Sequence, residues 1–126
     1  MKILLLICGL LVSILFGANQ VKVDTLAKEL STPLFYINND AVIDRIKFFV
    51  KDENNIQLIK VYDTLTNHIY LTYFKSGKEY RLLSKGIPKN IKLSNFMFKS
   101  DIKYDNDVIG TVEVYILTDW ILQKNK

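Results

Sequence analysis

The stretch FMFKSDIKYDNDVIGTVEVYIL at residues 96–117 carries the clearest structural pattern in the chain. Apolar and polar side chains alternate on both sides of Asp105-Asn106-Asp107, as they do in two β-strands joined by a tight turn. In the second strand, residues 110, 112, 114 and 116 share one face, and residues 111, 113 and 115 share the other. We therefore expect an antiparallel hairpin with one solvated face, and we expect Gly110 to mark a bulge or a close backbone approach.

The same alternation extends upstream. Residues 56–63 and 68–75 are rich in β-branched and aromatic side chains, which predicts two strands joined around residues 64–67. A short strand is expected at residues 80–83. The glycine, proline and scattered lysines that follow predict a loop up to the hairpin.

Two helices are predicted before the strands. The first has one apolar stripe and stops before Pro33, because the residue before a proline is pushed out of the helical region. A short extended piece at residues 34–37 then leads to residues 38–40, whose side chains suit the start of a second helix. The stripe of the first helix is Val23, Leu26, Ala27 and Leu30, and the buried face of the second is Val42, Ile46, Phe49 and Val50.

Helices followed by strands predict an α+β domain. We expect an antiparallel sheet of four to five strands, with a long N-terminal helix and a second short helix packed on one face. The chain has 126 residues, of which 49% are hydrophobic and 24% charged, and this leaves room for one globular domain.

Residues 1–18, MKILLLICGLLVSILFGA, place a lysine before an unbroken apolar stretch, as an export signal does. Its length favours a cleaved signal, because a helix over residues 3–18 measures about 24 Å against a hydrocarbon core of about 30 Å. The residues before Asn19 favour a retained anchor, since Phe16 would occupy a position where signal peptidase requires a small side chain. Both alternatives place the remaining residues outside the cytoplasm.

Residue counts exclude several chemistries. The only cysteine, Cys8, lies in the apolar segment, so the exported part has no thiol for a disulfide. The only histidine, His68, is too few for a zinc or copper site, and no G-x-S-x-G elbow surrounds any serine. Asp101, Asp105 and Asp107 lack the glutamate of a calcium loop. We expect no catalytic residues, no metal and no cofactor.

The net charge of +4 comes from lysines spread among aspartates, without a clustered basic surface. Proteins that bind nucleic acids concentrate their positive charge on one face or along one helix. A nucleic-acid partner is therefore not expected.

Several segments together resemble the extracytoplasmic PAS-like (Cache-related) sensor domains of bacterial histidine kinases and diguanylate cyclases. These are LSTPLFYI at residues 30–37, the pattern I-x-x-I-x-V-x-D at residues 56–63, Tyr104, and IGTVEV at residues 109–114. The resemblance implies a sensor domain at residues 19–119, after a signal peptide or anchor at 1–18 and before a polar tail at 120–126. The apolar segment predicts a periplasmic location, with residues 3–18 as an inner-membrane anchor if they are retained.

The function implied is ligand sensing in a signal-transduction receptor, here without the second membrane span and output module. The expected partners are a small organic ligand and, through the N-terminal helix, a second copy of the chain. From the predicted side-chain directions we expect Tyr36, Tyr73 and Ser100 to bind the ligand between the sheet and the helices. The alternative is a stand-alone periplasmic protein that binds a partner protein or an envelope component.

The positive flank at Lys2 predicts that residues 19–126 lie outside the cytoplasm. A periplasm-dependent phosphatase fused after Lys126 should therefore be active in cells. An inactive phosphatase, together with an active cytoplasmic reporter at the same site, would contradict this topology.

Overall fold

The computed structural model describes the backbone of residues 2–51, 53 and 55–117, and side chains from residue 19 onward within these ranges. Its elements, in chain order, are α1 (Lys2–Phe35), α2 (Asn39–Val50), β1 (Ile56–Asp63), β2 (His68–Ser76), β3 (Glu79–Leu83), β4 (Phe96–Tyr104) and β5 (Asp107–Ile116). The expectations for the side chains of residues 1–18 and for the tail at 120–126 lie outside this description. Where side chains are described, no helix has the length and apolar character needed to cross a membrane.

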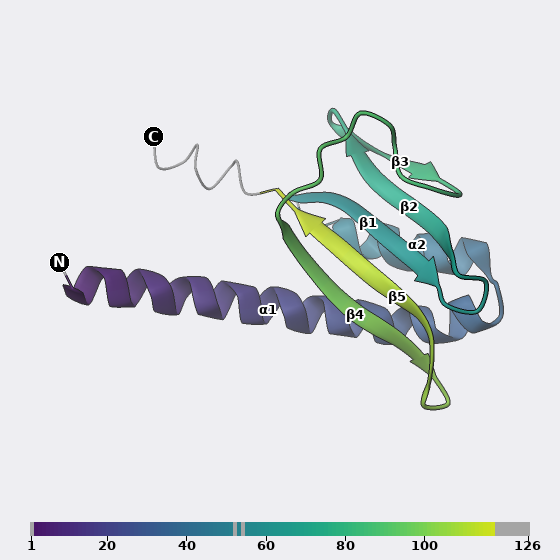
Figure 1. Cartoon of the computed structure of the whole chain (residues 1–126), viewed down its shortest axis with the longest axis horizontal. Helices are drawn as coiled ribbons and strands as arrows, with labels where there is room; N and C mark the ends of the chain where they lie inside the picture. The colour runs from purple at the N-terminus through teal and green to yellow at the C-terminus, as the bar shows by residue number, and fades with distance from the viewer. Residues whose placement is uncertain (1, 52, 54, 118–126) are drawn as a thin grey trace.

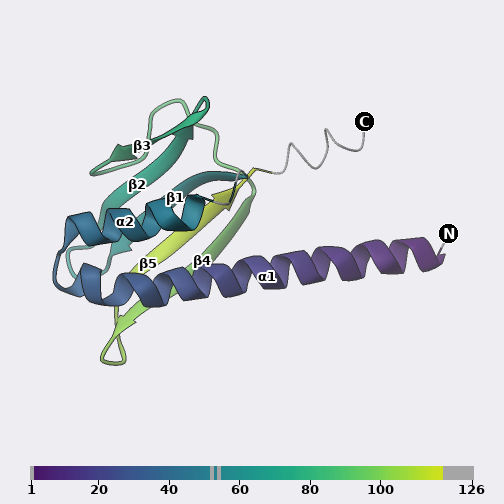
Figure 2. The same ribbon diagram turned by 180° about the vertical axis from the view of Figure 1, so that it is seen from behind.

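The five strands form one antiparallel sheet in the order β3-β2-β1-β5-β4, which confirms the predicted α+β class. Both helices lie on the same face of this sheet (Figures 1 and 2). Helix α1 crosses β4 and β5 and extends past the sheet toward its N-terminus, while α2 lies beside it (Figure 2).

The core lies between these two helices and the sheet. The predicted stripe of α1 is at most 2% exposed and is extended by Leu34. From α2 the buried side chains are Val42, Ile46 and Val50, with Phe49 packed at the edge. Each large apolar side chain removed from water in this way contributes about 1.5 to 3 kcal/mol, so the core is the main source of stability.

Helix α1 also covers the outer edge of β4. Gln20 donates a hydrogen bond to the Lys99 carbonyl (3.1 Å), and Ser31 donates one to the Lys103 carbonyl. An uncovered edge strand offers unpaired backbone groups to other chains, and these side chains occupy two of them.

The prediction that the first helix stops before Pro33 was wrong. Helix α1 continues through Pro33 to Phe35, so the first half of the piece predicted as extended is helical. Pro33 cannot donate a backbone hydrogen bond, and this weakens the helix locally. The helix nevertheless continues for two more residues, and the first of them, Leu34, is buried in the core with 6% exposure.

The end of α1 is closed by two backbone hydrogen bonds. The Asn38 amide donates to the Pro33 carbonyl (2.8 Å) and the Ile37 amide donates to the Leu34 carbonyl (3.1 Å), which is the Schellman arrangement. Asn38 then caps α2, because its side-chain oxygen accepts a hydrogen bond from the Ala41 amide. The chain thus turns from one helix into the next within three residues.

The expectation of a solvated sheet face was also wrong for the central strands. Leu58 and Thr72 point away from the helices and are nevertheless fully buried, and Thr111 is only 8% exposed. Residues 84–95 cover this face. They are held there by polar contacts, which an apolar pattern in the sequence does not reveal.

Two buried polar side chains of the sheet make these contacts. Thr72 donates a hydrogen bond to the Gly86 carbonyl (2.7 Å). Gln57 donates to the Lys92 carbonyl (2.8 Å) and accepts from the Ser94 amide (2.7 Å). A buried polar group needs such partners, so these bonds fix the path of the covering segment.

Gly110 lies at a close backbone approach, as the sequence predicted. A Cβ atom at this position would be 2.5 Å from the Tyr62 carbonyl oxygen and 2.8 Å from Cδ2 of Leu34. A register shift in the β4–β5 pairing lies directly beside it, between Ile102 and Lys103. Only glycine allows both β1 and α1 to come this close to β5.

We predict that Gly110→Val lowers the free energy of unfolding by about 1 to 3 kcal/mol, because the new side chain must displace the Tyr62 backbone or Leu34. Lys99→Ala, on the exposed side of β4, is the control and should change it by less than about 0.5 kcal/mol. Urea denaturation measures both. Equal denaturation midpoints for the two variants would contradict the assigned packing.

Candidate functional site

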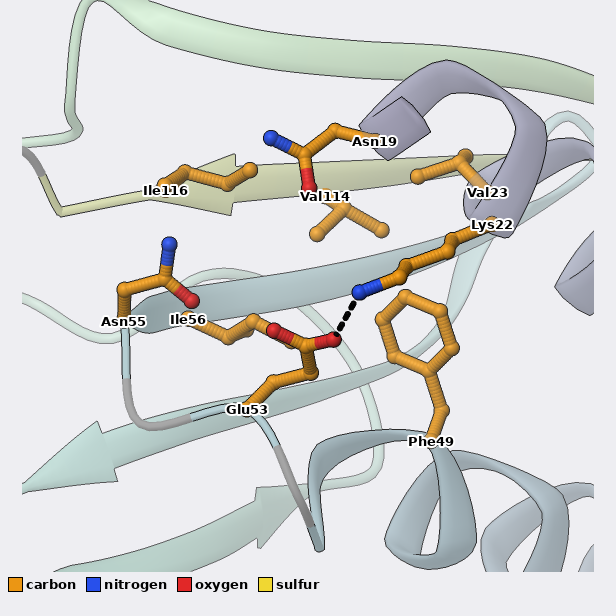
Figure 3. Close-up of a pocket in the computed structure, with 9 residues that line it drawn as sticks. All are labelled: Asn19, Lys22, Val23, Phe49, Glu53, Asn55, Ile56, Val114 and Ile116. Atoms are coloured by element: carbon orange, nitrogen blue, oxygen red, sulfur yellow. Dashed lines mark hydrogen bonds and ion pairs between the residues drawn. The ribbon is translucent and has the colours of Figure 1, made fainter. Parts of the chain in front are cut away.

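The gap between the helices and the sheet was the expected ligand pocket, and the packing leaves little space in it. The cavity there measures about 10 Å³, room for about one water molecule. Phe49 from α2 and Val114 and Ile116 from β5 line it, beside an ion pair of 2.5 Å between Lys22 and Glu53 (Figure 3). Sites for small organic molecules usually enclose about 300 to 1,000 Å³.

The three predicted ligand residues lie in different parts of the fold. Tyr73 on β2 is buried, and its ring stacks on Tyr80 with centroids 5.2 Å apart. Ser100 on β4 is half-buried and pairs with Val112. Strands β1 and β5 separate Tyr73 from Ser100, and Tyr36 is exposed at the turn after α1. The structure therefore does not bring them together.

Tyr73 and Tyr80 belong to the packed interior. Burial raises the pKa of both hydroxyls, and the neighbouring Tyr73 adds to the effect on Tyr80. The Tyr80 hydroxyl donates a hydrogen bond to the Ile56 carbonyl (2.9 Å). The pair therefore joins the edge of the sheet to the start of β1.

An exposed group of apolar side chains lies where α1 ends. We call Phe35, Tyr36, Ile37 and Tyr104 the aromatic end. The Phe35 and Tyr104 rings are stacked with centroids 3.8 Å apart, and Tyr36 meets both rings edge to face. Phe35, Tyr36 and Ile37 are 43%, 65% and 71% exposed. The sequence pattern did not predict this group, because these residues come from an assumed extended segment and a distant strand.

The backbone at Ile37 is strained. Its φ of 53° lies in the left-handed region, which a β-branched side chain rarely adopts. The other described non-glycine residues with positive φ are all Asn or Asp, which tolerate this conformation. Glycine is the usual residue at this position of a Schellman motif, so Ile37 costs stability there.

Acidic residues lie close to the aromatic end in the sequence. Asp105 and Asp107 flank the β4–β5 turn beside Tyr104, and Asp40 lies in the first turn of α2. The pKa of Tyr104 is raised, first by its hydrogen bond with Tyr36, then by burial and by the charges of Tyr36 and Asp105. Lys103 is the only lysine or arginine within three residues of the aromatic end in the sequence, so these segments are acidic although the whole chain is basic.

A polar network lies on the face of the sheet that points away from the helices. Glu113 pairs with Lys60 (3.0 Å) and accepts a hydrogen bond from the Tyr115 hydroxyl (3.0 Å). Burial, followed by the hydrogen bond to Glu113 and the charge of Glu113, raises the pKa of Tyr115 to about 12. Among the described residues, no three histidine, cysteine, aspartate or glutamate side chains are grouped as metal ligands would be.

The raised pKa of Tyr115 predicts alkaline destabilisation. Between the ordinary tyrosine value of 10.0 and about 12, the unfolded chain loses this proton and the folded chain keeps it. The free energy of unfolding should therefore fall as pH rises through that interval, and Tyr115→Phe should make the fall shallower. Urea denaturation at pH 9 to 12 measures it, and an identical pH dependence in Tyr115→Phe would contradict the prediction.

Comparison with protein-family models and with curated proteins gives no match to this sequence.

Proposed function

We propose that this chain is an exported recognition domain that binds a partner protein through the aromatic end. The observation that carries the proposal is Ile37, an exposed β-branched residue held in a left-handed backbone conformation. The left-handed conformation costs about 1 to 2 kcal/mol in an L-residue, and a side chain that remains in water recovers none of it. A contact made outside the folded domain would explain why this residue is present.

The neighbouring side chains suit such a contact. Exposed apolar groups gathered in one place are typical of protein-binding surfaces, and aromatic residues supply much of the binding energy there. The stacking of Phe35 on Tyr104 holds these rings in place before a partner arrives. Less side-chain freedom is then lost on binding.

The charges favour a basic partner. Asp40, Asp105 and Asp107 lie within three residues of the aromatic end in the sequence, and a protein with Lys or Arg around an apolar side chain would complement them. Association should therefore weaken as salt concentration rises.

The N-terminal part of α1 projects at the opposite end of the molecule from the aromatic end (Figure 1). A domain anchored through this helix would present the aromatic end away from the membrane.

Ligand sensing in a receptor of the PAS-like type is the second candidate. It is supported by α1, a single helix that reaches from Lys2 to the packed contact at Leu34. A change in the packing of the sheet could shift such a helix along its axis. Since the helix-sheet gap holds room for only about one water molecule, the ligand of a sensor would bind elsewhere or would have to open the core.

Ile37→Gly tests the main proposal. Removing the left-handed strain should raise the free energy of unfolding by up to about 1 kcal/mol, while removing a contact residue should weaken partner binding. A photoreactive amino acid at position 36, in cells that make the protein, should give a discrete product with an exported protein. Ile37→Gly should reduce the yield, and the purified pair should dissociate as salt rises.

Phe48 provides the matched control, because it is 69% exposed on α2 but lies outside the aromatic end. The photoreactive residue at position 48 should not give the same product. The proposal fails if both positions yield the same product or neither yields one. It also fails if Ile37→Gly leaves the yield unchanged.

A further inference from the structure

A groove of about 480 Å³ lies beside the β1–β2 turn, on the side of the sheet away from the helices. Its lining residues are Tyr62, Asn67, His68, Ile69, Lys85 and Gly86. The volume falls within the range of small-molecule sites, in contrast to the filled gap on the helix side. The groove is separate from the aromatic end, and its function does not depend on partner binding there.

The floor of the groove is apolar and ordered. Tyr62 and Ile69 are directly paired across β1 and β2, so their side chains stand next to each other on one face. The Tyr62 hydroxyl donates a hydrogen bond to the Asn67 side-chain oxygen. This bond holds the ring and leaves the Asn67 amide nitrogen able to donate to another group.

The charged lining residue is Lys85, and among the described residues it forms no ion pair. No acidic residue lines the groove. The nearest carboxylate in sequence, Asp63, is engaged within the turn, where it accepts hydrogen bonds from the Leu65 amide and the Thr66 hydroxyl.

The position of Lys85 is set by its neighbour. Gly86 has a φ of 90°, and its carbonyl accepts a hydrogen bond from Thr72, whose side chain is fully buried in the sheet. This contact fastens the loop to β2 beside the groove. The residue next to Lys85 is therefore hydrogen-bonded to the buried part of β2.

We propose that this groove binds a small organic anion. The apolar body of the ligand lies on Tyr62 and Ile69, and its carboxylate is held by Lys85, with the Asn67 amide as a further donor. Hydrogen bonds between a cation and a carboxylate are among the strongest that a protein makes, so the charge sets the orientation of the ligand. This places the expected small organic ligand on the opposite face of the sheet from the predicted pocket.

Titration of the full chain in detergent micelles tests the site, with benzoate as the probe and backbone amide NMR shifts as the readout. Benzoate should produce saturable shifts at residues 62, 67–69 and 85–86. Lys85→Gln should weaken binding about tenfold, the effect of losing one charge-assisted hydrogen bond. Lys89→Gln, which changes an exposed lysine of the same loop outside the groove, should leave the affinity unchanged.

Two further probes separate the contribution of the ligand's charge from that of its apolar ring. Benzamide has the same ring without the charge, and inorganic phosphate has the charge without an apolar body, so both should bind at least several-fold more weakly than benzoate. Equal binding of either probe, absence of saturable shifts with benzoate, or wild-type affinity in Lys85→Gln would overturn the proposal. Tyr36→Ala should not affect benzoate binding. The proposal for the groove and the proposal for the aromatic end can therefore fail independently of each other.

Discussion

The close contact of β5 with β1 and α1 at Gly110 determines how the rest of the domain is arranged. With no side chain at this position, the Tyr62 carbonyl and Leu34 both approach the β5 backbone. The contact keeps α1 helical through Pro33, because only a helix that continues to Phe35 brings Leu34 to this point. The position of the aromatic end follows from the same contact. Because Leu34 is held against β5, the chain turns at residues 36–38, directly after α1, and this turn carries the exposed side chains of Tyr36 and Ile37.

That turn connects stability with the proposed function. A glycine at position 37 would close α1 without strain, as it does in many helices. The chain instead has Ile37 there, next to exposed rings and acidic side chains. The Schellman hydrogen bonds need the left-handed backbone but not an isoleucine side chain, so the exposed side chain of Ile37 is a reason to look for a contact outside the domain.

The sequence predicted the elements well and the surfaces poorly. Alternation and side-chain type located β1, β2, β4 and β5, and the stripe from Val23 to Leu30 located the buried side of α1, because burial imposes a period on side chains. The helix through Pro33 was missed, since a local preference was overcome by the burial of Leu34. The covered far face was missed for another reason. Gln57 and Thr72 hold the covering loop through hydrogen bonds, and polar residues of this kind have no periodic pattern.

The candidate sites were hardest to predict because they depend on which segments meet. Tyr36 was chosen for its predicted direction toward the gap between sheet and helices, but its partner in the structure is Tyr104, 68 residues away in sequence. The groove likewise joins the β1–β2 turn to Lys85 through the register of two strands and one buried threonine. A dense core fills the space between the helices and the sheet. A ligand or partner that binds without rearranging the core therefore has to use surface sites where distant segments meet, such as these two. In this domain the packed interior therefore fixes where distant segments meet, and the exposed side chains at those places provide the candidate binding sites.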